Sequence, residues 1–434
     1  MLMVEDYPPD VTAPAVRMHN LVDVMSDRSE VDARIVVYSP RSTSKKMRAV
    51  KRITNNVSVV RYEHEYLRQL LGKLPQDNPL ALLITTLVAI REVRDYKPDL
   101  ILTTVPTYNP TIAIYLASLL LGTQYCIDIR DDWTNKRIAK WAIRNHPWYS
   151  RLIKALTSGL AHALFIKACQ RAFLLTSVYD SLVEDLQRLT SVEKPIVVVP
   201  NGINLSELEA VRQTFDKRSI LDKYGIPFDD GLKYVIYVGT IQDYYKPEIL
   251  IKPLQNMIRE GKKMCYIIIG EGDSDIIEKE IDANGDPEND IFLRNVAHND
   301  VLALLLASDV GFYALSRGFP VEYALAVKIL EYVGCKLPIL SVADEYILTT
   351  KFIKAHEIGI ALGWDETSLI KSSIEKLIQD PQFANNIDAY YADFVKEFGR
   401  KTNSEKLYEA IMQNYQRVAS PQADFTPVED SKKT

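Results

Sequence analysis

The sequence has few of the residues that build disulfide frameworks or zinc sites. Its 434 residues contain only four cysteines, Cys126, Cys169, Cys265 and Cys335, which stand far apart and form no Cys-x-x-Cys pair. The six histidines also lack the close spacing of metal ligands. We therefore expect neither structural zinc nor a disulfide framework, and we expect a reducing compartment.

Long apolar runs and a secretion signal are missing too. The longest apolar candidate, Ile112–Leu121, stops at Gly122, well short of the roughly 20 residues that span a bilayer. The first four residues lead straight into Glu5 and Asp6, whereas a signal peptide continues from a basic start into an apolar stretch. We expect a soluble, cytoplasmic protein that could attach peripherally to the inner face of the cell membrane.

The charge is distributed unevenly along the chain. Residues 1–200 contain 26 lysines and arginines against 20 acidic residues, and residues 201–434 contain 26 against 37. A basic first half favours an anionic partner, either a membrane surface or a phosphorylated ligand. Nucleic acid is disfavoured, because a protein of net charge −5 lacks a broad basic footprint.

Short β-branched runs alternate with helical patterns, which is typical of a parallel sheet with crossover helices. Strands are expected at 1–4, 33–39, 99–105, 125–131, 172–176 and 196–200, and in the second half at 234–239, 264–270, 291–296, 309–314, 337–342 and 359–362. The length predicts two or three domains of roughly 100–200 residues each. A concentrated turn signal, Pro200–Asn204, marks the boundary between two α/β halves.

We predict an α/β fold of two Rossmann-like, doubly wound domains that face a cleft. The first comprises residues 1–203 and the second residues 204–395. Helices over 396–419 are expected to pack back on the first domain, and the polar stretch 420–434 is expected to be a disordered tail. In open parallel sheets, ligands bind beyond the carboxyl ends of the strands, so the loops facing that cleft should carry the chemistry.

Two glycine-containing strand ends in the second half are candidates for anion binding. Gly239 and Thr240 follow a strand, and Lys246 opens the next helix; a glycine allows a ligand to approach the backbone, and a helix N-terminus attracts anions. Gly270 and Gly272 also follow a strand, but a lone Gly-x-Gly lacks the rest of a dinucleotide fingerprint. For both loops a simple tight turn is the alternative.

Lys328 and Glu331 form the most informative pair in the chain. They lie three residues apart and share one face of a predicted helix. In the functional interpretation the carboxylate grips a vicinal diol while the lysine faces phosphate oxygens. In the alternative interpretation they form an exposed ion pair, which contributes ~0.2–0.5 kcal/mol.

The segment 133–179 is basic and contains no Asp or Glu, and tryptophans are interleaved with its lysines and arginines. Such helices suit the surface of an anionic membrane. A basic helix that packs on the sheet with its charges in water is the alternative. The nearby run Asp128–Asp132 ends a strand and offers carboxylates for a site, although an Arg–Asp structural cluster explains it equally.

Taken together, these residues resemble the family 4 nucleotide-sugar glycosyltransferases of GT-B fold. The resemblance rests on Val199–Asn204 at the domain junction and on Lys328-x-x-Glu331-Tyr332-x-x-Gly334-x-x-Leu337-Pro338-Ile339. Tyr237–Gly239 and Ile268–Gly272 support it.

The resemblance implies that a sugar is transferred from a nucleotide diphosphate donor with retention of anomeric configuration and without a metal or other cofactor. The second domain would bind the donor. Glu331 would hold the ribose hydroxyls and Val296 would lie near the base. The diphosphate would face Gly239, Thr240, Lys246 and Lys328, and the Gly270–Gly272 loop would complete the donor site.

The acceptor, a glycan or a lipid-linked molecule, would enter over the first domain. The residues that the resemblance assigns to it are Pro9, Thr12, Arg17, Asp128 and Arg130. Asp131 is the candidate for a catalytic role on the acceptor side, and Lys246, Lys328 and Glu331 are the catalytic candidates on the donor side.

Three positions depart from the family pattern. Val11–Pro14 stands where the family commonly has glycines, and Thr240 stands where an arginine often follows the glycine. Tyr323 occupies the place of a second glutamate, with Glu322 one position out of register. Lys246 would therefore supply more of the countercharge, and the contacts to the donor sugar stay open.

Two other functions also fit these residues. Asp273 and Asp275 would serve a metal-dependent glycosyltransferase, which predicts a fold dominated by a single sheet. A non-catalytic nucleotide-sugar binding protein would keep its role after the loss of Lys246.

Overall fold

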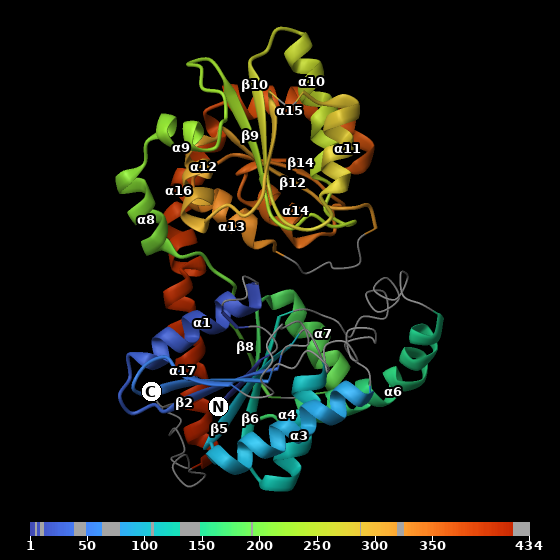
Figure 1. Ribbon diagram of the computed structural model, residues 1–434, viewed down its shortest axis with the longest axis vertical. Coiled ribbons are helices and arrows are strands. Elements are labelled where there is room, and N and C mark those ends of the chain that lie inside the picture. Colours follow the sequence, from blue (N-terminus) through green and yellow to red (C-terminus); the bar gives the residue numbers. More distant parts are fainter. Residues whose placement is uncertain are drawn as a thin grey trace, which may run out of the picture. The chain divides into compact units, whose positions relative to one another are not determined.

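The computed structural model describes residues 1–4, 7–8, 13–38, 49–62, 79–105, 108–130, 148–191, 194–286, 288–318 and 325–419. The chain divides into two compact units (Figure 1). Unit 1 contains Met1–Pro200 and the chain from Lys401 onward, and unit 2 contains Asn201–Arg400. Each unit is built on its own sheet.

Unit 1 is built on an eight-stranded sheet of order β3-β4-β2-β1-β5-β6-β7-β8. Its strands are β1 (Leu2–Val4), β2 (Ala33–Tyr38), β3 (Ala49–Arg52), β4 (Val57–Tyr62), β5 (Leu100–Val105), β6 (Gln124–Ile129), β7 (Leu174–Ser177) and β8 (Ile196–Val198). All neighbours are parallel except β3, which pairs antiparallel with β4 at the edge. Residues on both faces of the central strands are buried, as a sheet covered by helices on two sides requires.

Helices cover both faces of this sheet. They are α1 (Ala13–Ser26), α3 (Pro79–Tyr96), α4 (Tyr108–Leu121), α6 (Trp148–Arg171), α7 (Asp180–Thr190) and α17 (Arg400–Ala419). Side chains of α1 and α17, among them Leu21, Leu407 and Ile411, share one apolar core with the sheet. The segment after Arg400 thus completes the core of unit 1.

Unit 2 is built on a six-stranded parallel sheet of order β11-β10-β9-β12-β13-β14. Its strands are β9 (Lys233–Val238), β10 (Met264–Ile269), β11 (Asp290–Leu293), β12 (Val310–Ala314), β13 (Ile339–Val342) and β14 (Gly359–Leu362). Numbered within the unit, this order reads 3-2-1-4-5-6, the Rossmann order, whose ligand site lies where the order reverses. In unit 2 that point lies between β9 and β12.

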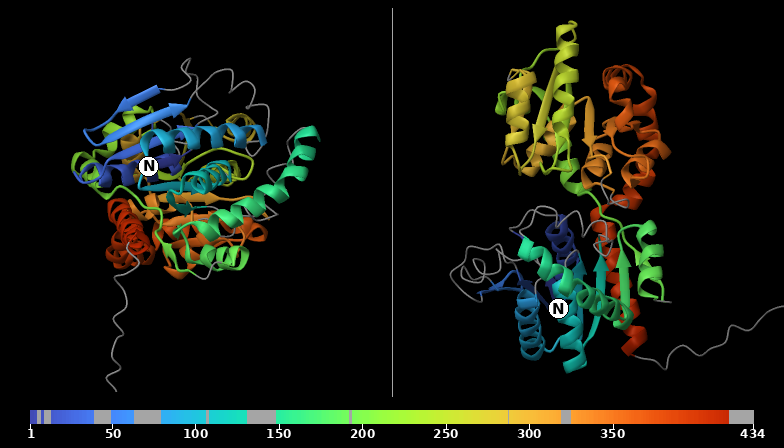
Figure 2. Two further views of the ribbon diagram at one scale, coloured as in Figure 1. Left: turned by 90° about the horizontal axis from the view of Figure 1, so that it is seen from below. Right: turned by 90° about the vertical axis from the view of Figure 1, so that its right-hand side faces the viewer.

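The helical elements of unit 2 flank both faces of its sheet (Figure 2). They are α8 (Leu205–Thr214), α9 (Lys217–Lys223), the 3-10 helix η1 (Pro247–Leu250), α10 (Ile251–Arg259), α11 (Asp275–Asn284), α12 (His298–Ala307), α13 (Val327–Gly334), α14 (Leu348–Ala355), the 3-10 helix η2 (Trp364–Leu369), α15 (Ile370–Gln379) and α16 (Gln382–Phe398). Helices α10, α11 and α15 share the core on one face with Val310 and Phe312 of β12. Helix α13 packs on the other face, where the Tyr332 ring lies against Gly311.

The predicted fold class is confirmed, and two strands were not predicted from the sequence. Both units are Rossmann-like and doubly wound, which contradicts the single dominant sheet of the metal-dependent alternative. The missed strands, β3 and β4, form a short antiparallel pair at the sheet edge. Strand β3 ends in Lys51 and Arg52, and charged residues of this kind are common on edge strands and weaken the apolar pattern that identifies a strand.

A tyrosine hydroxyl holds β9 and β12 together where the strand order reverses. The two strands pair only at Val310↔Val235 and Gly311↔Ile236. Beyond that, the Tyr332 hydroxyl accepts a hydrogen bond from the Val238 N–H (3.1 Å) and donates one to the Phe312 carbonyl (2.9 Å). A Cβ atom at Gly311 would lie 2.6 Å from the Tyr332 ring, so the glycine makes room for this side chain.

We predict that Tyr332→Phe lowers the free energy of unfolding of unit 2 by about 1–3 kcal/mol, because it leaves a buried N–H and a buried carbonyl without their partner. Urea unfolding of the full chain measures the change. Tyr224→Phe is the matched control, since its hydroxyl donates to Asp300 at a site that is only partly buried. An equal decrease in the free energy of unfolding for the two variants would contradict the bridging role of Tyr332.

Candidate functional site

The loop after β9 is fixed on both sides at the carboxyl edge of the unit 2 sheet. Ile241 forms a bridge with Gly272 of the loop after β10. The Lys246 N–H donates to the Ala314 carbonyl at the end of β12 (3.2 Å), and the Ser316 N–H donates to the Tyr244 carbonyl (2.7 Å). Residues 239–246 therefore lie at the point where Rossmann folds bind their ligands.

Three glycines permit this close approach of backbones. Gly239 and Gly272 have φ values of +141° and +130°, which side chains of L-residues rarely adopt. A Cβ atom at Gly270 would lie 2.1 Å from the Gly239 carbonyl oxygen, and one at Gly272 would lie 2.0 Å from that of Ile241. Loop packing alone thus explains Gly270 and Gly272, which agrees with the tight-turn alternative for that motif.

Lys328 of α13 is buried directly beside Gly239. Its Nζ donates a hydrogen bond to the Tyr237 hydroxyl (2.9 Å) and lies 4.2 Å and 3.9 Å from the ring centroids of Tyr237 and Tyr245. A Cβ atom at Gly239 would lie 2.4 Å from this Nζ, so no side chain separates the lysine from the loop. The Tyr237 hydroxyl in turn donates to the Thr240 carbonyl (2.8 Å) and ties the lysine to the same loop.

This environment changes the acid–base behaviour of the lysine. Burial lowers the pKa of the Lys328 ammonium to about 7, and the negative charge of Glu331 opposes that shift. Aromatic rings stabilise the charged form only in part. Lys328 therefore lies close to its titration point near neutral pH and would become fully charged next to an additional anion.

Lys246 precedes the 3-10 helix η1, which leads directly into α10. Its Nζ lies 3.6 Å from Oε1 of Glu248, and its side chain is about 29% exposed. Thr240 is exposed in the same loop. Its carbonyl is engaged by Tyr237, and its hydroxyl has no hydrogen bond to the described part of the chain.

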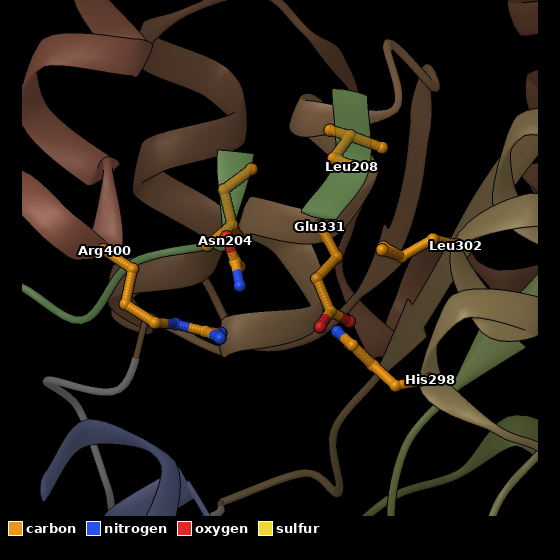
Figure 3. Close-up of a pocket in the computed structure, with 7 residues that line it drawn as sticks. Asn204, Leu208, His298, Leu302, Glu331 and Arg400 are labelled. Carbon is orange, nitrogen blue, oxygen red and sulfur yellow. The ribbon is translucent and has the colours of Figure 1, made fainter. Parts of the chain in front are cut away.

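Glu331 lines a pocket of unit 2 on the same helix as Lys328 (Figure 3). His298 and Arg400 lie on other sides of that pocket, together with Ile203, Asn204, Leu208 and Leu302. Burial raises the pKa of the Glu331 carboxyl, while the charges of His298, Arg400 and Lys328 oppose the shift. Within the described part of the chain the carboxylate makes no hydrogen bond and no ion pair, and the nearest stabilising charges are those of His298 and Arg400.

The exposed ion pair of the alternative interpretation does not form between Lys328 and Glu331. Lys328 turns toward the tyrosines at the end of β9, whereas Glu331 turns into the pocket. His298 and Arg400 were not predicted from the sequence. His298 pairs with Glu207 (3.7 Å), and Arg400 Nε donates to the Gly202 carbonyl (3.0 Å). No local motif could have revealed them, because the pocket brings together residues that are far apart in the sequence. Arg400 comes from the segment where the chain leaves unit 2.

Val296 is half-buried in the loop after β11. The preceding residue, Asn295, has a left-handed backbone (φ +53°), and its N–H donates to the Glu271 carboxylate (2.7 Å). Glu271 comes from the Gly270–Gly272 loop, so the loops after β10 and β11 are joined at the carboxyl edge of the sheet.

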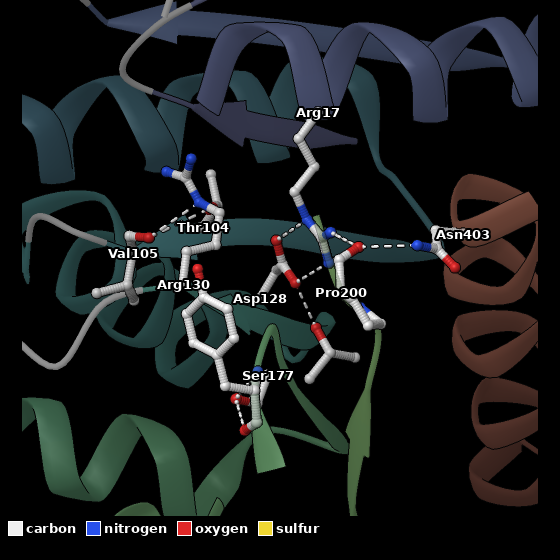
Figure 4. A network of polar contacts seen from close by, with 10 residues as sticks. Arg17, Thr104, Val105, Asp128, Arg130, Ser177, Pro200 and Asn403 are labelled. Atoms are coloured by element: carbon white, nitrogen blue, oxygen red, sulfur yellow. Dashed lines mark hydrogen bonds and ion pairs between the residues drawn. The ribbon is translucent and has the colours of Figure 1, made fainter. Parts of the chain in front are cut away.

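In unit 1, two predicted acceptor residues form a buried ion pair (Figure 4). Arg17 Nε and Nη2 donate to the two carboxylate oxygens of Asp128, at 3.0 Å each, and Thr176 donates to Oδ1 of Asp128 (2.6 Å). Burial alone would raise the pKa of the Asp128 carboxyl, but Arg17 and Thr176 outweigh it and lower the pKa. This is the Arg–Asp structural cluster of the alternative interpretation.

Arg17 also donates to the Pro200 carbonyl (3.0 Å), which accepts a second hydrogen bond from Asn403 of α17 (3.2 Å). The ion pair thereby joins α1, β6 and the end of β8 to the returning helix. Arg130 Nε donates to Thr104 and to the Val105 carbonyl. Pro9, Thr12 and Asp131 lie outside the described residues.

The described ranges contain no group of three or more His, Cys, Asp or Glu side chains placed to hold a metal ion. Asp273 and Asp275 are exposed at the start of α11. Across the same ranges, no helix has both the length and the apolar character that spanning a bilayer demands.

Comparison of the sequence with known proteins finds two matches. Residues 221–393 match the family "Glycosyl transferases group 1". A curated relative, an uncharacterized glycosyltransferase of Methanocaldococcus jannaschii, is 22% identical over 270 residues, which are 61% of this chain and 60% of the relative.

Solved structures match over nearly the whole chain. Sucrose-phosphate synthase of Thermosynechococcus elongatus superposes with a TM-score of 0.69 at 13% identity, covering 96% of this chain and 99% of that one. The Anabaena protein HepE, in complex with UDP-glucose, superposes with a TM-score of 0.61 at 14% identity, covering 95% and 99%. The chain therefore has the GT-B fold, and the stretch that matches the group 1 glycosyltransferase family lies within its second unit.

Proposed function

We propose that this protein is a retaining, metal-independent glycosyltransferase that moves a sugar from a nucleotide diphosphate donor to a glycan or lipid-linked acceptor at the cytoplasmic face of the membrane. The observation that carries the proposal is that two charged side chains of α13 face different surroundings. Lys328 lies beneath the Gly239 loop, and Glu331 presents to a pocket in the same unit a carboxylate that makes no hydrogen bond or ion pair within the described residues.

The donor would bind along the carboxyl edge of the unit 2 sheet. Glu331 would accept hydrogen bonds from the ribose hydroxyls, and the diphosphate would lie at the 239–240 backbone, close to Lys246 and Lys328. The half-buried Val296 would face the base. The group 1 domain match and the UDP-glucose complex of the similarly folded HepE support a nucleotide sugar as the ligand.

The charges suit the chemistry of glycosyl transfer. Cleavage of the bond to the donor sugar adds negative charge to the departing diphosphate, so cations and helix N-termini aimed at it stabilise the transition state more than the ground state. Retention would follow from attack on the same face of the sugar, with the leaving phosphate accepting the acceptor proton. Asp131 stays our candidate for an acceptor-side role in unit 1.

The membrane part of the proposal rests on sequence charge. The first 200 residues are basic, and the segment 133–179 lacks acidic residues. Each basic residue close to an anionic bilayer contributes about 1 kcal/mol. Unit 1 would then encounter a lipid-linked acceptor at the bilayer surface to which it is attracted.

We predict that Glu331→Gln weakens donor binding by about 10²-fold, because the diol loses charge-assisted hydrogen bonds, with little change in unfolding. Calorimetric titration with a panel of nucleoside diphosphates measures binding, and mass spectrometry measures donor consumption. Asp273→Asn with Asp275→Asn is the matched control and should leave both unchanged. Loss of turnover in that control, or on addition of a chelator, would favour the metal-dependent alternative.

Binding without any consumption of donor by the wild-type chain, across a panel of sugars and acceptors, would favour the non-catalytic alternative. Retention is checked separately by determining the anomeric configuration of the product. A product of inverted configuration would contradict same-face attack, but it would not contradict the proposed donor binding.

We also predict that donor binding is linked to protonation of Lys328. The unliganded lysine has a pKa of about 7, and a neighbouring diphosphate would raise it, so at pH 8 binding should take up close to one proton and affinity should fall as pH rises above 7. Titration calorimetry in buffers of different ionisation enthalpy measures the uptake. Lys328→Met should abolish the proton uptake, whereas Lys246→Met, which changes a partly exposed lysine, should weaken binding and keep the uptake. Uptake that persists in Lys328→Met would contradict this assignment.

A further inference from the structure

Three helices of unit 1 expose a concentration of leucine side chains. Of thirteen large apolar side chains that are exposed in the described ranges, seven are leucines on α3, α4 and α6. They are Leu80, Leu83 and Leu87 of α3, Leu119, Leu120 and Leu121 of α4, and Leu160 of α6. Helix α4 contacts both α3 and α6, so the three helices form one layer.

Helix α3 is apolar on two opposite sides. Its inner side is buried and includes Ala81, Val88 and Val93. Leu80, Leu83 and Leu87 follow at helical spacing on the outer side and are 38–58% exposed. A surface helix of a globular protein normally places polar residues on that side, so the leucine stripe is an unsatisfied apolar face.

The stripe continues into basic residues. Arg91 and Arg94 are exposed on the next turns of α3, and Asp95 is the acidic partner of Arg91 at 3.7 Å. On α6, Leu160 is followed by the exposed Lys167 and Arg171, and no acidic residue lies between 159 and 171. Leucines flanked by arginine and lysine are the combination with which helices lie on anionic lipid.

We propose that the leucine surface, defined as the seven leucines of α3, α4 and α6, docks on an anionic lipid bilayer. The leucines enter the boundary between headgroups and acyl chains, and the flanking arginines and lysines contact lipid phosphates. A second copy of the chain fits less well, because a two-fold interface would bring the basic groups of one copy against those of the other. The inference rests on the proposed function for its purpose, since a membrane-docked unit 1 meets a lipid-linked acceptor, but its evidence is independent of the donor site.

The test is co-sedimentation of the full chain with vesicles of phosphatidylcholine and phosphatidylglycerol. The triple variant Leu83→Gln, Leu87→Gln, Leu120→Gln should bind at least about tenfold more weakly than wild type, because each glutamine removes an apolar side chain from the lipid boundary. These side chains are exposed, so the fold should be retained, which circular dichroism checks. Phe228→Gln with Leu369→Gln is the matched control in unit 2, where the same kind of change should leave binding unaltered.

Equal binding of wild type and triple variant, or no binding of wild type, overturns the proposal. A wild-type dimer in solution that the triple variant converts to a monomer, without vesicle binding, assigns the surface to a second copy and overturns it as well. Donor consumption with a water-soluble acceptor separates the two proposals, since the leucine variant should match wild type in that assay. If wild type consumes no donor but binds vesicles through the leucines, the glycosyltransferase proposal fails and the docking surface stands.

Discussion

The site in unit 2 depends on holding a lysine side chain away from water at the edge of a parallel sheet. Removing an ammonium group from water costs several kcal/mol in real proteins. Here the compensation is incomplete, because Lys328 has one tyrosine hydroxyl and the faces of aromatic rings rather than a carboxylate partner. The pKa of about 7 reflects this balance. An anion at the Gly239 loop would complete the compensation, and for that reason the lysine is informative about the ligand.

Helix α13 carries three side chains of the candidate site on neighbouring turns. Lys328, Glu331 and Tyr332 lie at i, i+3 and i+4, on one side of the helix. Tyr332 fixes the helix to the splayed ends of β9 and β12, and this contact sets the positions of the other two side chains. Two glycines make room for these side chains. A Cβ atom at Gly311 would collide with Tyr332, and one at Gly239 would collide with Lys328.

The sequence predicted the architecture well because its signals are local. Buried parallel strands such as β10 are apolar throughout, and their spacing by helices gives the doubly wound class directly. Lys328 and Glu331 could be chosen because they lie on one turn of one helix. The tyrosines that enclose the lysine, and the pairing of Arg17 with Asp128, depend on contacts between residues that are 91 and 111 positions apart, and no local pattern specifies such contacts. Strand β3 was missed for another reason, since it lies at the sheet edge and ends in two charged residues, which weaken the apolar pattern.

Charge pairing distinguishes structural residues from candidate site residues in this chain. Arg17 and Asp128 are buried and satisfy one another with two hydrogen bonds, and a third partner, Thr176, completes the carboxylate. Such a buried pair is costly to break. Lys328 and Glu331 are of opposite charge and near enough to influence each other's pKa, yet they turn to different surroundings and stay unpaired. Their separation is the physical basis of our proposal that unit 2 binds the donor.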